Sequence, residues 1–310
     1  MKAVAGIRAA TDPGEIIVSS QDESPRINQI EVPQIRRYTL ASLAAAGVAG
    51  ALGVLRARFQ HSHMFTPTRY PEGEWDPARQ GLVYRDVWFD SEPGVRLHGW
   101  WIEHGAPRAT VLYCHGNAGS LGSRVEIFRY FQRLKVNVFA FDYRGYGRST
   151  AAAPSEQGLY RDARAAYACL TGELGVAPRE ILLFGHSMGG AVAVDAALDC
   201  PVSGLIVQSS FTDLRDMARH AFPGVPMHWI TRNCFRSIAK VGRLGMPKLF
   251  VHGRADTVVP YVLGERLYAA AAAPKSRFAV PGADHNDLHL QGKAVPYFQV
   301  LARFRRRCVG

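Results

Sequence analysis

The sequence lacks paired cysteines, internal repeats and long runs of one charge. Its five cysteines are an odd number and none belongs to a CxxC pair, which argues against a disulfide framework and against a zinc site. No self-similarity with a period of roughly 20–50 residues is present, which excludes solenoid and propeller folds. No run of lysine or arginine is interleaved with aromatics, so nothing marks a nucleic-acid-binding protein. We therefore expect neither a bound metal nor a nucleic-acid partner.

The composition indicates a folded protein with a basic surface. The chain has 310 residues, of which 47% are hydrophobic, so it can form a large core without disulfides, and one large domain plus a tail is the expected organisation. The net charge is +11, of which residues 1–79 supply only +1 and four arginines among the last eight residues supply +4. We interpret the excess as a solvated basic surface, with contact to anionic lipid as the alternative.

The first 79 residues divide into three parts. Residues 1–37 are polar and interrupted by prolines, and they show no apolar period, so we predict disorder there. Residues 38–55 contain no charge and are flanked by arginines on both sides. As a helix they would be about 27 Å long, which is just enough to cross a bilayer. Residues 56–79 are expected to form a linker.

The uncharged segment 38–55 has three interpretations. We favour a single membrane-spanning anchor, because alanine and glycine lie on all sides of the helix, whereas an amphipathic core helix would show a polar face. A signal peptide and a buried soluble helix are the alternatives. Because arginines flank both ends, charge bias leaves the orientation in the membrane open.

Residues 80–310 show the pattern of a parallel sheet covered by helices. Two β-rich runs joined by a turn come first, and short apolar runs then alternate with helical ones, which predicts a mostly parallel sheet of about eight strands with helices on both faces. The strands are expected at 82–89, 95–102, 110–114, 137–141, 180–184, 204–208, 248–252 and 276–280. The helices are expected at 124–134, 157–174, 189–198, 262–272 and 293–306. Function on such sheets lies at the carboxyl ends of the strands.

The strand at 180–184 runs directly into the sequence GHSMGG, which contains the pattern G-x-S-x-G around Ser187. Between a strand and a helix, this pattern forms a sharp turn that exposes the serine at the positive end of the helix. Side chains at Gly185 or Gly189 would collide with neighbouring elements. We therefore predict that Ser187 is a nucleophile.

A serine nucleophile needs a base, and the base needs an acid that orients it. His285 follows the last strand and precedes the last helix, and Asp256 follows the strand before it. The order Ser187, Asp256, His285 is that of a serine hydrolase triad. Asp213 and Asp284 are rival acids, but the first is better explained as a helix start and the second is adjacent to the histidine.

The tetrahedral intermediate needs two backbone donors. We assign them to the N–H of Met188, which follows the nucleophile, and the N–H of Asn117, where Gly116 lets the loop turn toward the site. His186 is interpreted as a positional neighbour of the nucleophile that lines the site. His115 and His252 each precede a glycine at a strand end, and we expect them to brace loops.

Together these residues belong to five ordered motifs: LYCHGNAG, FDYRGYGRS, GHSMGG, VHGRADTVVP and PGADHNDL. Over residues 80–307 they resemble the α/β-hydrolase superfamily, and more narrowly the branch of membrane-anchored α/β-hydrolase-domain proteins and bacterial proteins labelled serine-aminopeptidase-like. The resemblance implies the same triad and oxyanion donors as above. It also implies that Tyr143 and Arg144 belong to a site-lining loop of mainly structural role, and that an N-terminal membrane helix is present.

The segment between the sixth and seventh expected strands, 209–246, is short, and we expect two or three small helices there. Its apolar side chains form either an acyl-binding wall or part of the core. They are Phe211, Met217, Phe222, Met227, Trp229, Ile230 and Phe235. We include Phe211 among the site-lining residues.

These observations predict a serine hydrolase that cleaves esters or thioesters of a small-molecule or lipid-like acyl substrate through an acyl-enzyme. The mechanism requires no metal and no cofactor. A serine aminopeptidase-like activity is the first alternative, although only Asp213 and Asp216 offer carboxylates for a substrate ammonium in 209–246. A non-catalytic, membrane-tethered scaffold on a hydrolase fold is the second. Nothing in the sequence specifies an oligomeric state.

Overall fold

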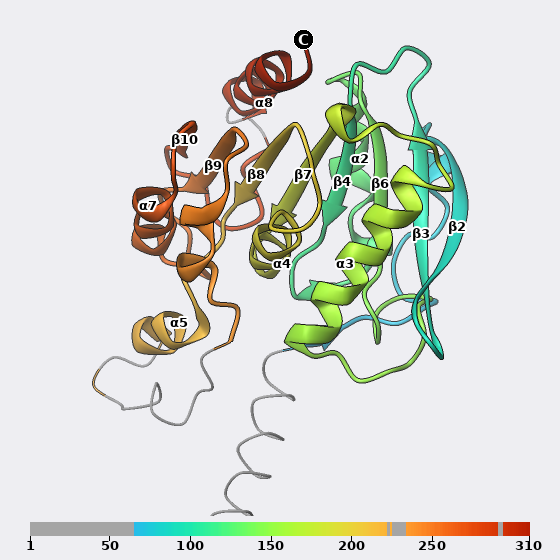
Figure 1. Cartoon of the computed structure of the whole chain (residues 1–310), viewed down its shortest axis with the longest axis horizontal. Helices are drawn as coiled ribbons and strands as arrows, with labels where there is room; N and C mark the ends of the chain where they lie inside the picture. The colour runs from blue at the N-terminus through green and yellow to red at the C-terminus, as the bar shows by residue number, and fades with distance from the viewer. Residues whose placement is uncertain (1–64, 222–223, 225–233, 291–293) are drawn as a thin grey trace, which may run out of the picture. The chain divides into compact units, whose positions relative to one another are not determined.

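Eight strands form one sheet in the computed structural model, which describes residues 65–221, 224, 234–290 and 294–310 (Figure 1). Their order across the sheet is β10-β9-β8-β7-β4-β6-β3-β2. Their bounds are β2 Val83–Glu92, β3 Val95–Glu103, β4 Thr110–Cys114, β6 Asn137–Phe141, β7 Ile181–His186, β8 Gly204–Gln208, β9 Lys248–Gly253 and β10 Lys275–Val280. All eight correspond to predicted strands, whose ends move by at most three residues.

The sheet is mostly parallel, as predicted. β2 and β3 form an antiparallel hairpin, and β3 also pairs antiparallel with β6. The remaining neighbours, from β6 through β4, β7, β8 and β9 to β10, are parallel. The carboxyl ends of these six strands therefore lie at one edge of the sheet, where the loops that follow them meet.

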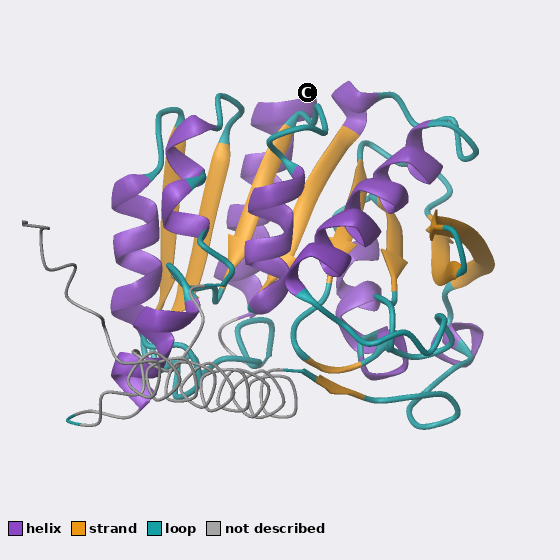
Figure 2. Cartoon of the chain, turned by 60° about the horizontal axis from the view of Figure 1, so that its bottom comes forward, coloured by secondary structure: helices purple, strands orange, loops and turns teal. Residues whose placement is uncertain are grey.

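Helices cover both faces of the sheet, which confirms the predicted layering (Figure 2). One face is covered by α3 (Glu156–Thr171), α4 (Met188–Ala196) and α7 (Tyr261–Ala270). The other face is covered by α2 (Val125–Gln132) and α8 (Ala294–Val309). Each of these five helices corresponds to a predicted one.

Alternation along the buried strands assigns side chains to the two faces. In β4, Leu112 and Cys114 lie in the core beneath α3, α4 and α7, whereas Val111 and Tyr113 lie in the core beneath α2 and α8. Successive side chains of a strand point to opposite faces. A strand buried on both faces therefore reads as a continuous apolar run, as the sequence of β4 does.

The linker predicted over 56–79 is wrong for its described part, residues 65–79. Phe65 is 5% exposed and belongs to the core. β1 (Thr66–Pro67) pairs in parallel with β5 (Ala118–Gly119), and a 3-10 helix spans Pro77–Gln80. This stretch belongs to the same folded domain as the sheet, because apolar side chains and backbone pairing hold it there. Two-residue strands leave no periodic signal in the sequence.

Two other predictions lie wholly outside the described residues. They are the disorder predicted for 1–37 and the membrane-spanning helix predicted for 38–55. Within the described part of the chain, no helix combines the length and apolar character needed to cross a membrane.

The segment 209–246 contains α5 (Leu214–Ala221) and two short 3-10 helices, Ser237–Ala239 and Val241–Arg243, as expected for a short insertion. Phe235 is buried against Phe65 and Tyr160. Phe211 is likewise buried in the core, and Met217 is partly buried against it. The acyl-wall residues Phe222, Met227, Trp229 and Ile230 lie outside the described residues.

Candidate active site

Ser187 lies at the sharp turn between β7 and α4 (Figure 1). Its backbone has φ 56° and ψ −121°, a left-handed φ that residues other than glycine seldom adopt. A Cβ at Gly185 would lie 2.3 Å from the carbonyl oxygen of Gly189, and one at Gly189 would lie 2.1 Å from that of Cys114. The steric reason predicted for the two glycines is therefore confirmed.

The backbone of the turn is fixed from the neighbouring strand. The N–H of Ser187 donates to the carbonyl oxygen of Gln208 at the end of β8, at 2.8 Å. The serine is 8% exposed and stands at the N-terminus of α4. The positive end of the helix dipole thus faces the space beside the hydroxyl, where negative charge is favoured.

The structure brings Ser187, His285 and Asp256 together from three loops. His285 Nε2 lies 3.0 Å from Ser187 Oγ, and its Nδ1 lies 2.9 Å and 3.1 Å from the two carboxylate oxygens of Asp256. Because the carboxylate accepts only, Nδ1 carries the proton and Nε2 keeps a lone pair toward the hydroxyl. This is the arrangement in which an imidazole can take the proton of a serine.

Asp256 is built to remain ionised. Its side chain is fully buried, yet Oδ1 accepts the N–H groups of Val258 and Val259 at 2.9 Å and 2.7 Å. Oδ2 lies 3.1 Å from His252 Nε2. Burial raises the pKa of the Asp256 carboxyl, but the hydrogen bonds from His252, His285 and Val259 outweigh it and hold that pKa far below the ordinary value.

The two rival acids have other partners. Asp213 caps the start of α5, because its Oδ1 accepts the N–H of Asp216 at 2.9 Å, as predicted for a helix start. Asp284 accepts the N–H and hydroxyl of Thr257 and the backbone N–H of His285, at 2.7–2.9 Å. In the described chain neither carboxylate bonds the imidazole of His285.

The loop after β4 approaches the nucleophile closely. A Cβ at Gly116 would lie 3.3 Å from Ser187 Cβ, so a side chain there would press on the nucleophile. The N–H groups of Asn117 and Met188 donate to no other group in the described chain. Both predicted oxyanion donors are thus left available for a bound oxyanion.

Side chains hold this loop from two directions. Asn117 Oδ1 accepts the N–H of Thr66 at 3.3 Å and the hydroxyl of Tyr146 at 3.2 Å. Tyr143 donates its hydroxyl to the carbonyl of His115 at 3.2 Å. Since Tyr143 is fully buried, it supports the loop from within rather than facing a ligand.

The histidines flanking the site are positional, as predicted for His115, His186 and His252. His115 Nδ1–H donates to the carbonyl of Gly116 at 2.7 Å. His186 Nε2–H donates to the carbonyl of His285 at 3.3 Å, and the two rings are 5.0 Å apart. Burial, then the charge of His285, lowers the pKa of His186 well below its ordinary value, so this ring is neutral.

Arg144 lies behind the site and ties its loop to the domain. Its guanidinium bonds the carboxylate of Asp162 on α3, with Nη2 2.7 Å from Oδ1, and also pairs with Glu92. The side chain is nearly buried, and none of these hydrogen bonds goes to Ser187, His285 or Asp256. The structural role implied for Arg144 agrees with these contacts.

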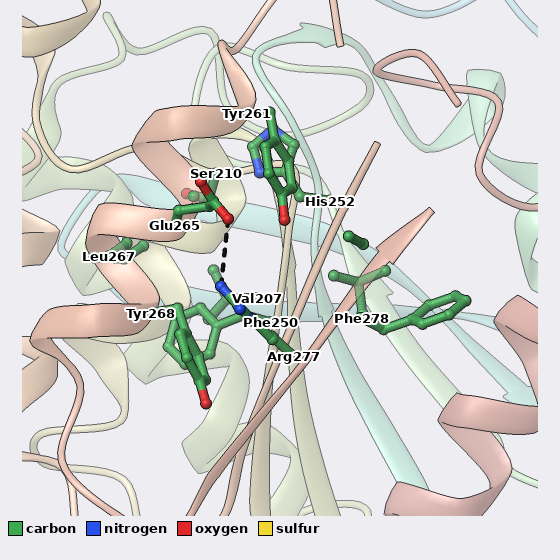
Figure 3. A pocket seen from close by; sticks show the side chains of 13 residues that line it. Val207, Ser210, Phe250, His252, Tyr261, Glu265, Leu267, Tyr268, Arg277 and Phe278 are labelled. Atoms are coloured by element: carbon green, nitrogen blue, oxygen red, sulfur yellow. Dashed lines mark hydrogen bonds and ion pairs between the residues drawn. The ribbon is translucent and has the colours of Figure 1, made fainter. Parts of the chain in front are cut away.

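Two pockets border the site. The first lies behind the acid, between α7 and the ends of β8, β9 and β10, and Figure 3 shows His252, Tyr261, Glu265 and Arg277 around it. Glu265 and Arg277 form an ion pair of 3.3 Å there. The second pocket lies beside His186 and is lined by α2, strand ends and the loop at 286–290. No cluster of three or more metal-ligating side chains occurs among the described residues.

Sequence reasoning missed the second role of His252. Its Nε2 lies 2.9 Å from the carbonyl of Val259 and 3.1 Å from Asp256, so it holds both the loop and the acid. Gly264 on α7 makes room for it, because a Cβ there would lie 2.2 Å from His252 Nδ1. In the sequence, only the spacing of four residues between His252 and Asp256 hints at this contact. Whether two residues at that spacing meet depends on the conformation of the loop between them.

Comparisons with known proteins agree with this fold. Residues 105–239 match the family model described as serine aminopeptidase, S33. An uncharacterized protein of Mycobacterium tuberculosis is 41% identical over 208 residues, which cover 66% of this chain and 74% of that protein. The α/β-hydrolase domain-containing protein WAV2 of Arabidopsis thaliana is 35% identical over 296 residues, covering 86% of this chain and 92% of its own length.

Among solved structures, an esterase of Pyrococcus furiosus is similar with a TM-score of 0.66 and 22% identity, over 80% of this chain and 99% of its own. That likeness concerns the fold. Fold and relatives together define an α/β hydrolase. The chain belongs to the α/β-hydrolase family.

Proposed function

We propose that this hydrolase cleaves carboxylic esters or thioesters of acyl substrates, with Ser187 as nucleophile, His285 as base and Asp256 as the orienting acid. The observation that carries the proposal is the unbroken chain of hydrogen bonds, 3.0 Å from Ser187 to His285 and 2.9 Å from His285 to Asp256, at the ends of three parallel strands. An ionised acid and an imidazole lone pair aimed at the hydroxyl support the same roles.

In the proposed reaction, Ser187 Oγ attacks the carbonyl carbon while its proton passes to His285 Nε2. The N–H groups of Met188 and Asn117 hydrogen-bond the resulting oxyanion. When the tetrahedral intermediate collapses, the proton moves from His285 to the departing alcohol or thiol, and the acyl group stays on Ser187. Water then attacks the acyl-enzyme, gives its proton to His285 and releases the carboxylic acid, while Ser187 regains its proton.

The engagement of the acids in 209–246 favours an ester over a peptide substrate. Recognition of a free amino terminus requires a carboxylate that faces the substrate ammonium. Asp213 caps α5, and Asp216 pairs with Arg219 at 2.8 Å and with Arg266 at 3.0 Å. If the protein hydrolyses an aminoacyl p-nitroanilide faster than any p-nitrophenyl ester, the aminopeptidase hypothesis is favoured instead.

A membrane location through residues 38–55, and with it a lipid-like substrate, is part of the proposal. It rests on the uncharged 18-residue segment. Fractionation of cells with an alkaline wash tests it: a spanning helix keeps the full chain in the membrane pellet, and release into the supernatant would contradict it.

Labelling by a fluorophosphonate probe tests the nucleophile. The wild-type chain should be labelled, and Ser187→Ala should lose labelling and ester hydrolysis together. Ser276→Ala, a matched change in β10 away from the site, should keep both. Labelling that persists in Ser187→Ala would overturn the assignment.

A further inference from the structure

The pocket beside His186 is unused by the proposed chemistry. It lies between the N-terminal end of α2, the ends of β4, β7 and β8, and the loop that follows His285. Its lining includes the polar side chains of Arg124, Glu126, His186 and His289 and the aromatic side chains of Tyr113 and Phe184. The pocket thus has an apolar floor and a polar wall, which is typical of a small-molecule subsite.

The pocket is adjacent to the reacting groups. His186 precedes the nucleophile in sequence, and its ring packs 5.0 Å from that of His285. A Cβ at Gly116 would lie 3.2 Å from His186 Nδ1 and 3.3 Å from Ser187 Cβ, so the oxyanion loop borders both. His186 is thus the lining residue that links this pocket to the reacting groups, next to Ser187 in the chain.

Arg124 is the one positively charged group among the lining residues that the structure describes. Its Nη2 donates a hydrogen bond to the carbonyl oxygen of Ala118, in the loop that carries Asn117. Its Nε is buried without a hydrogen-bond partner, and the guanidinium forms no ion pair with any described acid. The bond to Ala118 therefore uses one donor of a partly buried guanidinium and leaves its charge without a carboxylate partner among the described residues.

The other polar side chains of the pocket do not supply that partner. His186 and His289 have pKa values lowered, in both cases chiefly by burial, so both are neutral. Glu126 is exposed and interacts with His289 rather than pairing with Arg124. The N-terminal end of α2, where Arg124 is the cap residue, adds a second positive contribution to the pocket.

We propose that this pocket is a subsite for an anionic group of the substrate, a carboxylate or a phosphate, which Arg124 binds beside the carbonyl that Ser187 attacks. The inference rests on the proposed esterase activity and adds a substrate class to it, namely esters or thioesters that carry a negative charge near the scissile bond. The missing partner of Arg124 is then supplied by the substrate.

Two pairs of chromogenic esters test the subsite in the full chain. The first pair places the charge on the acyl side: the p-nitrophenyl half-ester of adipic acid against neutral p-nitrophenyl hexanoate. The second pair places it on the leaving group: 4-acetoxybenzoate against its methyl ester. Comparing wild type and variant within each pair cancels the intrinsic reactivity of each ester and shows which side of the scissile bond carries the anion.

In Arg124→Gln, kcat/KM for the charged member of one pair should fall by about 10- to 100-fold, mostly through KM, as expected for loss of a charge-assisted hydrogen bond. The neutral member should fall by no more than about threefold, from the lost bond to Ala118. Arg129→Gln removes the same charge from the exposed face of α2 and should leave the ratio within each pair unchanged.

The possible outcomes distinguish failure of the anionic subsite from failure of the proposed esterase activity. An equal fall for charged and neutral esters in both pairs would mean that Arg124 only braces the oxyanion loop, and the subsite would be overturned while the esterase stands. If the wild type hydrolyses no ester and Ser187 is not labelled by a fluorophosphonate, the proposed function itself fails. A selective loss with the charged ester that Arg129→Gln does not reproduce supports the subsite.

Discussion

Among the described residues, Asp256 and Asp142 are buried aspartates that each lie beside a histidine at the carboxyl ends of strands, and the two pairs are built in opposite ways. In the pair behind the nucleophile, Asp256 accepts four donors and is bonded to His285 at 2.9 Å. In the pair beneath the oxyanion loop, Asp142 accepts one N–H, from Leu121 at 2.9 Å, and His115 Nε2 lies 3.6 Å away. Both aspartate side chains are fully buried.

The difference in donors decides the charge of each pair. Burial raises the pKa of Asp142 to about 7, and the bond from Leu121 and the nearby arginines only partly oppose this. Burial lowers the pKa of His115 to about 3. At Asp256 burial is outweighed by hydrogen bonds. Equal burial therefore gives an acid that orients a base in one place and, in the other, a pair that is neutral below about pH 7.

The contrast between Asp256 and Asp142 is tested most strongly by replacing each carboxyl with an amide. Asp256→Asn should lower kcat for an ester by roughly 10³- to 10⁴-fold, because an amide no longer stabilises the imidazolium or fixes its tautomer. Asp142→Asn should lower kcat by no more than about threefold, since it removes a carboxyl that touches none of the reacting groups and that still holds its proton below about pH 7. Comparable losses in the two variants, measured by steady-state hydrolysis, would break the distinction.

A smaller effect is expected at His252, the positioning residue of the first pair. His252→Phe removes one donor from Asp256 and should lower kcat by about 10-fold, with little change in KM, because a hydrogen bond to a charged group is lost. His252→Gln keeps an N–H donor and should recover most of that loss. If the two variants behave alike, the contribution of His252 is packing against Gly264 and Tyr261 rather than support of the acid.

Sequence reasoning could reach the first pair but not the second. Ser187, Asp256 and His285 follow β7, β9 and β10, whose carboxyl ends lie at the same edge of the parallel sheet, so their approach follows from the topology. The state of Asp142 depends on a donor from Leu121 and on the close approach of Gly147, because a Cβ at Gly147 would lie 1.9 Å from Asp142 Oδ2.

The same limit explains the misplaced linker. Pairing of Thr66–Pro67 with Ala118–Gly119 spans about fifty positions and involves two residues on each side, so no local pattern predicts it. The eight strands of the sheet, in contrast, were predictable, because each is an apolar run with turn residues at its ends.

The smallest expected effect concerns stability rather than activity. The pKa of Asp142 is raised in the folded chain, from about 4 to about 7, so any stabilisation from this carboxyl is complete below its unfolded value and is lost as the pH rises through about 7. Asp142→Asn should therefore match the wild type near pH 4 and be more stable by about 1–3 kcal/mol at pH 8. Thermal and urea melts at both pH values measure the difference. A variant that is less stable than the wild type at pH 8 would mean that Asp142 is ionised in place and paired, and the contrast between the two acids would be lost.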